Sequence, residues 1–283
     1  MRAIASVIIL MKEESCGLRD VLAAVFAQEY KDIEVMLLSS LPIPELPQEY
    51  PLEVIRAAKN FPGKALNQAF ARAKGDYLVV LDARALPRNP RWLHSLLGHF
   101  LDKEVAAVGG WGCDPERISF PQTSYRLDLA GFLADPELGL SNVCCAYRRE
   151  VWERHPFRDS LKQCEDKEWA FRVLKEGQVV VMEYAATVYY IPPEAPPGEA
   201  AFRQYWEKNK AFSSFLNRNA LDPWEYGKKV FGQAWRKRDP SLLRRGVRAY
   251  RLSRRLNYEM GDLASICKAR VRFFKGLDFL QHP

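Results

Sequence analysis

The chain has 283 residues, of which 48% are hydrophobic and 27% are charged, and its formal net charge is +7. This composition is typical of a globular protein, and it excludes a collagen-like, coiled-coil or wholly disordered chain. The sequence contains no run of about 18 apolar residues, so it predicts no membrane span.

The first third of the chain alternates strand-like and helix-like segments. The apolar run 5–10 has the length of a buried strand, and 18–28 carries apolar residues at helical spacing. Further strands are predicted over 33–39, 52–58 and 77–82, with a helix over 63–75. Such alternation predicts right-handed crossovers and a mostly parallel sheet that is buried on both faces.

The middle of the chain continues with a helix over 90–101 and a strand over 105–109, whereas 110–145 reads as rich in loops. A strand and a helix follow within 141–157. The next helix spans 165–177, with Gly177 suited to the position after the C-cap, and a strand spans 179–185.

Four prolines between 191 and 200 indicate a stiff, extended elbow. We therefore predict two domains, an α/β domain over 1–195 and a basic, mainly helical extension over 196–283.

The positive charge is concentrated in the last sixty residues. Residues 224–283 contain fifteen Lys and Arg against five Asp and Glu, interleaved with aromatic residues. This mixture suits an interfacial helix on an anionic membrane surface. Ordinary packing of an amphipathic helical subdomain is the alternative. Nucleic acid is a weaker candidate because the order of strands and helices matches no nucleic-acid-binding fold.

The six cysteines form no CxxC pair, and the four histidines are scattered. We predict free, buried thiols in a cytoplasmic protein and no zinc site. The apolar start of the chain is interpreted as a strand, because no small-residue cleavage site of a signal peptide follows it.

Ligands of parallel sheets bind beyond the carboxyl ends of the strands, so residues 10–14, 39–40 and 82–84 are expected to converge. Asp82 ends a strand, and Glu165 with Asp166 opens a helix. Taken singly, the first could be a turn former and the other two an acidic helix start. Together they indicate a site with two acidic elements.

Five segments in this order resemble inverting family 2 glycosyltransferases of the GT-A fold. "SVIILMKEE" is similar to the family's first strand, and "FAQEYKDIEVMLLSS" to its second. "GKALNQAFARAKGDYLVVLDARALP" resembles the run that ends in Leu-Asp-x-Asp, and "YRREVWERHPF" with "EDKEWAFRVLKEG" resembles the acceptor-side helices with the Glu-Asp motif. The match covers about residues 5–190. A weaker resemblance extends to residue 220, where the chain is similar to rhamnosyltransferase-like members of the family.

The resemblance implies an α/β fold with a Rossmann-like mixed sheet flanked by helices, followed by a helical C-terminal extension. It implies that Asp166 is the general base and that Glu165 orients the acceptor or the base. It further implies a nucleotide-sugar site in which Asp82 lies beside the ribose and the donor sugar. The remaining residues of that site would be Leu10, Met11, Glu13, Ser39, Lys64, Asn67 and Arg84.

Three positions depart from the family pattern. Ser39 stands where the family has an aspartate for the base or ribose, and Arg84 stands where the second Asp of Asp-x-Asp binds Mg²⁺ or Mn²⁺. Tyr189 and Tyr190 stand where many members have a histidine. A guanidinium can do part of a metal ion's work on a diphosphate, so the metal is expected from the family but dispensable here.

Three interpretations of Arg84 follow. It replaces the metal in a working enzyme; or the donor site has decayed, leaving a module that binds a glycan, lipid carrier or protein; or Arg84 is a surface residue paired with Asp76 or Glu13. In the last case a metal would bind weakly through Asp82 alone.

The sequence favours the enzyme. It would be an inverting glycosyltransferase, cytoplasmic or peripheral at the inner membrane face, that transfers a sugar from a nucleotide-diphosphate sugar to a glycan or lipid-linked acceptor in cell-surface polysaccharide synthesis. A sugar-nucleotide nucleotidyltransferase is disfavoured, because that class usually has a Gly-rich, basic signature after the first strand, whereas "LMKEESCGLRD" carries two glutamates there.

Overall fold

The computed structural model describes residues 5–12, 17–43, 50–57, 62–113, 123–136, 139–190 and 199–216. The chain divides into two compact units, Met1–Pro192 and Pro193–Pro283. The predicted boundary between 195 and 196 stays a prediction.

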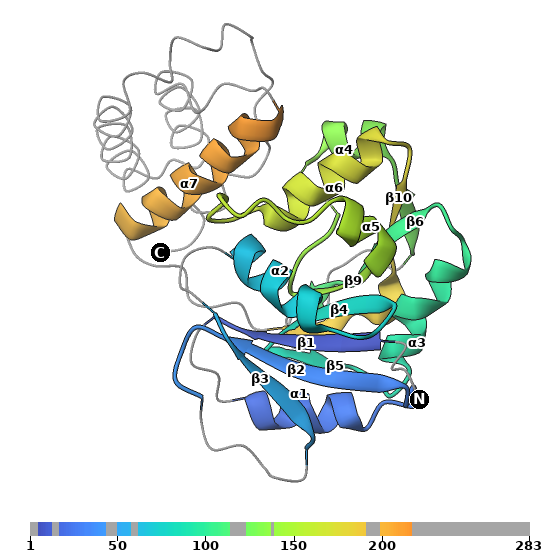
Figure 1. Ribbon diagram of the computed structural model, residues 1–283. Helices are drawn as coiled ribbons and strands as arrows, with labels where there is room; N and C mark the ends of the chain where they lie inside the picture. The colour runs from blue at the N-terminus through green and yellow to red at the C-terminus, as the bar shows by residue number, and fades with distance from the viewer. Residues whose placement is uncertain are drawn as a thin grey trace, which may run out of the picture. The chain divides into compact units, whose positions relative to one another are not determined.

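A mixed sheet forms the centre of the first unit (Figure 1). Its described strands run in the order β3 (Leu52–Arg56), β2 (Ile33–Ser39), β1 (Ala5–Met11), β4 (Tyr77–Asp82), β9 (Cys144–Arg148), β6 (Val105–Gly109), β10 (Val179–Met182) and β8 (Tyr125–Leu127). The first four strands are parallel, as the alternating pattern predicts. Strand β9 is antiparallel to both of its neighbours, and β8 is antiparallel to β10.

A smaller sheet consists of β5 (Ala85–Pro87), β11 (Val188–Tyr190) and β7 (Gly112–Cys113). Helices α1 (Leu18–Phe26) and α3 (Trp92–Leu97) cover one face of the central sheet (Figure 1). The other face carries α2 (Pro62–Arg72), α5 (Arg149–Arg154), α6 (Glu165–Lys175) and α4 (Leu129–Ala134). The 3₁₀ turns are η1 (Gly98–Leu101) and η2 (Tyr184–Ala186), and α7 (Glu199–Leu216) is the described part of the second unit.

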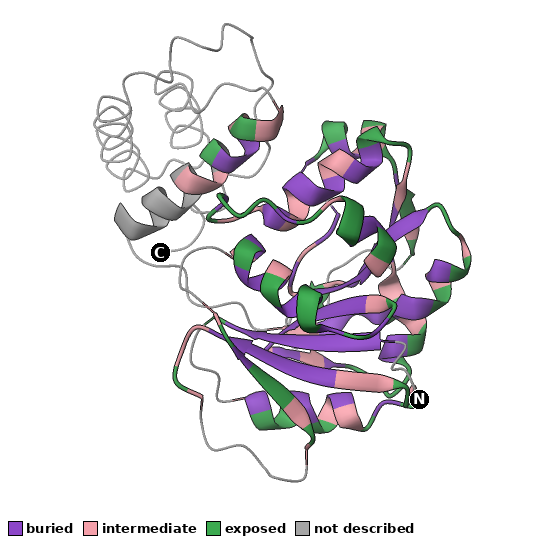
Figure 2. Cartoon of the chain, in the orientation of Figure 1, coloured by how far each residue is buried: buried purple, intermediate pink, exposed green. Residues whose placement is uncertain are grey.

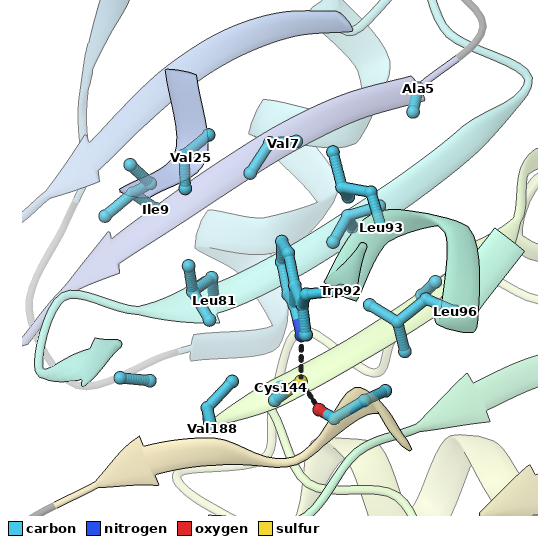
Figure 3. Close-up of a cluster of buried hydrophobic side chains, with 14 of the residues drawn as sticks. Ala5, Val7, Ile9, Val25, Leu81, Trp92, Leu93, Leu96, Cys144 and Val188 are labelled. Carbon is cyan, nitrogen blue, oxygen red and sulfur yellow. Dashed lines mark hydrogen bonds between the residues drawn. The ribbon is translucent and has the colours of Figure 1, made fainter. Parts of the chain in front are cut away.

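Strands β1, β2 and β4 are apolar runs because helices cover both of their faces, and Figure 2 shows them buried along most of their length, whereas the edge strand β3 is largely exposed. On the α1 side, Trp92 is fully buried among side chains of β1, β4 and β9 (Figure 3). Its indole N–H donates to the Cys144 sulfur at 3.2 Å, and that thiol donates to the Ala186 carbonyl at 3.3 Å. The buried indole and thiol thus link α3, β9 and η2.

Helix α6 ends as its sequence predicts. Gly177 has φ +81°, and its N–H donates to the Leu174 carbonyl at 3.2 Å. The Gln178 N–H donates to the Val173 carbonyl at 3.2 Å, which completes a Schellman motif. Side chains other than glycine rarely adopt this φ, so Gly177 fixes where the helix stops.

The region 110–145 contains more regular structure than the sequence indicates. It holds the short strands β7 and β8 and the six-residue helix α4, whose N-cap Asp128 accepts from the Gly131 N–H at 2.8 Å. The predicted strand over 179–185 is shorter, because the chain turns into η2 after Met182.

Candidate active site

Four residues that the sequence singles out lie side by side where the parallel strands end. Leu10 of β1 lies opposite Asp82 of β4, and Met11 lies opposite Ser39 of β2. Parallel strands present their carboxyl ends at one edge of the sheet, so this convergence follows from the strand order. The expectation that 10–14, 39–40 and 82–84 meet is confirmed for the described residues.

Asp82 is paired with Arg84 at this edge. The Asp82 carboxylate is almost fully buried, and Oδ1 accepts from the Arg84 backbone N–H at 3.0 Å and from Nε at 3.1 Å. Oδ2 accepts from Arg84 Nη2 at 3.3 Å, and the same Nη2 donates to the Tyr190 hydroxyl at 3.2 Å. The guanidinium lies 5.5 Å from the centre of the Tyr190 ring. Two carboxylate oxygens and a hydroxyl thus hold the arginine in one orientation.

A second acidic cluster opens α6. Asp166 Oδ2 accepts from the Asn142 backbone N–H at 3.2 Å, and Oδ1 accepts from the Lys167 N–H at 2.8 Å. The Glu165 side chain is buried, and its Oε1 accepts from Asn142 Nδ2 at 2.8 Å. Because one asparagine contacts both carboxylates, Glu165 and Asp166 form a single hydrogen-bonded group.

The pKa of the Glu165 carboxyl is raised above its ordinary value of 4.5. Burial is the largest cause, and the negative charge of Asp166 adds to it. The positive charge of Lys12 and the hydrogen bond from Asn142 act in the opposite direction. Lys12 follows β1 and is exposed, so a cation at the end of the first strand acts on the acidic pair of α6.

The sequence itself now identifies the family. Residues 6–155, just over half of the chain, match the family model described as glycosyl transferase family 2. The chain belongs to this family. Its members are glycosyltransferases, and so is this chain. Among curated proteins, none matches the sequence.

Solved structures confirm the GT-A fold of this family 2 glycosyltransferase. The mannosyltransferase PcManGT from Pyrobaculum calidifontis, in complex with GDP-Man and Mn²⁺, is 16% identical, with a TM-score of 0.60 over 95% of this chain and 82% of that one. TarS 1-349 of S. aureus is 15% identical, with a TM-score of 0.56 over 91% and 75%. Glucosyl-3-phosphoglycerate synthase from Mycobacterium tuberculosis is 16% identical, with a TM-score of 0.55 over 77% and 82%.

PcManGT holds Mn²⁺, but the described residues of this glycosyltransferase do not fit a divalent ion. Among them, no group of three His, Cys, Asp or Glu side chains is arranged to bind a metal. The carboxylate of Asp82 has both oxygens engaged by Arg84, and the neighbouring side chain is the hydroxyl of Tyr190. Hard cations prefer several oxygen ligands, whereas this donor set surrounds a guanidinium.

Asn67 and Lys64 lie on α2, the helix expected beside the nucleotide-sugar. Lys64 is exposed. The amide of Asn67 is engaged within the protein, since Oδ1 accepts from Trp152 Nε1 at 3.0 Å and from the Phe157 N–H at 3.0 Å. Its Nδ2 donates to the Phe157 carbonyl at 2.8 Å and to Asp159 Oδ1 at 2.9 Å. Asn67 therefore joins α2 to residues 152–159, and its role toward the nucleotide stays a prediction.

The Ser39 hydroxyl forms a local turn. It donates to the Leu41 carbonyl at 3.1 Å and accepts from the Leu41 N–H at 3.0 Å. This replaces the aspartate of the family pattern with a neutral group that is already hydrogen-bonded. Glu13, also expected in the nucleotide pocket, lies outside the described residues.

Sequence reasoning did not single out Asn142 as a site residue, and it noted Tyr190 only as a departure from the family pattern. Asn142 follows a segment without a regular apolar period, and it contacts residues of α6 that are 23 and 24 positions away. The available signal was the polar pair Ser141 and Asn142 directly before a buried strand. Residues at a strand terminus are often placed at the sheet edge where ligands bind.

The raised pKa predicts that Glu165→Gln stabilises the protein at neutral pH. Because the folded-state pKa lies above 4.5, the folded protein keeps a proton that the unfolded chain releases, so stability falls as pH rises above that value. The glutamine side chain of this variant would not titrate but could still accept from Asn142. We expect a melting temperature a few degrees higher than wild type at pH 7.5, with the gain disappearing at pH 4.

Calorimetric melting at the two pH values measures this effect. Glu104→Gln is the control, because the side chain of Glu104 is 72% exposed. An equal gain for Glu165→Gln at both pH values would show that ionisation of Glu165 does not cause it.

Proposed function

We propose that this protein is an inverting glycosyltransferase that transfers a sugar from a nucleotide-diphosphate sugar to a hydroxyl of a glycan or lipid-linked acceptor in cell-surface polysaccharide synthesis. The observation that carries the proposal is the pair of clusters at one sheet edge, Asp82 with Arg84 and Glu165 with Asp166. Val143 and Asn142, which are adjacent in the chain, contact one cluster each. GDP-Man in PcManGT and UDP in TarS 1-349 support the class of donor. The rhamnosyltransferase-like subtype stays a prediction.

In the proposed reaction the acceptor oxygen attacks the anomeric carbon while the bond from that carbon to the diphosphate oxygen breaks. The bonding electrons leave with the nucleoside diphosphate, and the acceptor proton passes to the Asp166 carboxylate. A single displacement of this kind inverts the configuration. A positioned carboxylate base accounts for about 10²–10⁴-fold in rate. Glu165 orients the acceptor or the base.

Arg84 takes the place of the metal in this proposal. The departing diphosphate gains negative charge, and a fixed guanidinium stabilises it by charge-assisted hydrogen bonds. The Arg84 side chain keeps 19% of its surface exposed, which leaves the cation accessible to a ligand. Among the described residues at this strand end, Asp82 is the carboxylate expected to hold a metal, and here it holds the arginine. Leu10, Met11, Glu13, Ser39, Lys64 and Asn67 complete the proposed nucleotide-sugar site.

Calorimetric titration with a panel of nucleoside diphosphates and diphosphate sugars tests the proposal, followed by transfer assays with the donor that binds best. Binding of one base series and release of its diphosphate on addition of acceptor would support it. No binding of any donor would indicate the alternative, a decayed GT-A module that binds a glycan, lipid carrier or protein.

The basic, aromatic segment 224–283 lies outside the described residues, and we propose that it docks the enzyme on the anionic, cytoplasmic face of a membrane. In the described part of the chain, no helix has the length and apolar character to cross a bilayer. The intact protein is expected to co-float with vesicles containing anionic phospholipid and to dissociate as salt is raised. Equal behaviour with zwitterionic vesicles would overturn this proposal.

A further inference from the structure

Residues 142 and 143 connect the two charged clusters directly. The Val143 carbonyl accepts from the backbone N–H of Asp82 at 2.9 Å. The preceding residue, Asn142, donates its backbone N–H to Asp166 and its side-chain Nδ2 to Glu165. A hydrogen-bonded route between the Asp82 backbone and the predicted base therefore passes through two consecutive residues.

The Asn142 amide has one orientation that satisfies its neighbours. It is buried, and its Oδ1 accepts from the Tyr147 hydroxyl at 2.8 Å and from the Cys145 thiol at 3.4 Å. With two donors on Oδ1, the NH₂ group must face the Glu165 carboxylate. An inverted amide would place N–H groups against donors and a carbonyl oxygen against a carboxylate, which is costly at a buried site.

The packing of the Tyr147 ring in turn fixes the position of its hydroxyl. Tyr147 is fully buried and packs edge-on against Phe157 and Trp169, with ring centres 5.4 and 4.9 Å away. Burial raises the pKa of this phenol well above its ordinary value, so it remains a donor at any working pH. The aromatic core thus fixes the side-chain amide of Asn142, and this amide in turn holds the Glu165 carboxylate.

We infer that Asn142 is a positioning residue that sets the placement of Glu165 and Asp166 relative to Asp82, and so the distance between base and donor sugar. The inference rests on the proposed function for its kinetic consequence, but the contacts themselves do not depend on it. A displacement of about 1 Å at a reacting centre can cost about 10²-fold in rate. Loss of the Asn142 amide should therefore reduce turnover more than donor binding.

Three variants test the inference. Asn142→Ala removes the side-chain amide that contacts Glu165 and keeps the backbone N–H that contacts Asp166. Tyr147→Phe removes the hydroxyl that orients the side-chain amide while keeping the ring. Gln28→Ala is the matched control, because Gln28 is another buried amide, with bonds to Ala24, Asn89 and Leu93, at the end of α1 where the parallel strands begin. Each variant is compared with wild type by kcat, by donor KM and by ¹³C NMR titration of the glutamate carboxyls, with Glu165→Gln to assign the signal.

We expect Asn142→Ala to lower kcat at least tenfold with donor KM within twofold of wild type, and Tyr147→Phe to lower it less. The NMR titration should show the pKa of Glu165 raised further in Asn142→Ala, because a donor to the ionised form is lost. Gln28→Ala should change neither kcat nor the pKa of Glu165, although it should lower the melting temperature.

The outcomes separate the inference from the proposed function. A kcat of Asn142→Ala within twofold of that of Gln28→Ala would overturn the inference. If wild type transfers no sugar but the Glu165 titration moves in Asn142→Ala, the positioning contact stands and the proposed reaction falls. If the titration does not move, Asn142 does not hold the pair, and the inference is overturned whatever the activity.

Discussion

Replacing Asp166 with asparagine is expected to lower turnover at least a hundredfold while the protein keeps its fold and its donor affinity. The amide has the size of the carboxylate but cannot take the acceptor's proton, so the full contribution of the base is lost. In wild type the backbone N–H groups of Asn142 and Lys167 contact the two oxygens of Asp166 at 3.2 and 2.8 Å. The single oxygen of the asparagine side chain can still accept from one of these two donors. The loss of stability should therefore be small compared with the loss of rate.

Single-turnover rates and donor titrations of Asp166→Asn and wild type measure the two quantities separately. Asp128→Asn is the control, because Asp128 also lies at a helix N-terminus, where it caps α4, and asparagine caps a helix equally well. A turnover of Asp166→Asn within a few fold of wild type would show that another group removes the proton.

Removing the Arg84 guanidinium is expected to weaken binding of the diphosphate sugar about tenfold to a hundredfold. A hydrogen bond to a charged group contributes about 1.5–3 kcal/mol, which corresponds to this range. Wild-type binding should be unchanged by a chelator, since the described donor set suits a guanidinium rather than a divalent ion. Arg84→Lys should recover part of the affinity, because lysine keeps the charge but not the planar fork.

Arg84→Asp is the sharpest variant, because it creates a second carboxylate two residues after Asp82. Donor binding by this variant is expected to depend on Mn²⁺ and to be lost with chelator. Arg72→Ala serves as the control, since Arg72 forms an exposed ion pair with Glu53 on the same unit. A wild-type protein whose donor binding disappears with chelator would show that a metal, not Arg84, carries the diphosphate.

The parallel half of the sheet was predictable from sequence because its strands are long apolar runs bounded by turns. Strand β8 and helix α4 were not, since three residues and six residues are too short to show a period, and β8 is defined by its pairing with β10. The acidic residues of the site were predictable because Asp82 ends a strand and Glu165 and Asp166 open a helix.

The partners of those residues depend on tertiary contacts that no local pattern encodes. The sequence left three interpretations of Arg84 open: replacement of the metal, a decayed donor site, and a surface ion pair with Asp76 or Glu13. In the structure it pairs with Asp82, whereas Asp76 precedes the opposite end of β4. Tyr190 reaches Arg84 across 106 positions of sequence, and so it could be noted only as a departure from the family pattern.

The direction of β9 determines what the sheet can place at its functional edge. The parallel strands β1, β2 and β4 reach this edge with the residues at which they end. Strand β9 runs the opposite way between β4 and β6, so it reaches the same edge with the residues from which it starts. Because β9 is antiparallel, the segment that leads into it, with Asn142 and Val143, lies beside the segments that follow β1, β2 and β4. Asn142 and Val143 at the site edge are directly followed by β9, a strand in the middle of the sheet. A one-residue insertion before Cys144 would therefore disturb both clusters at once.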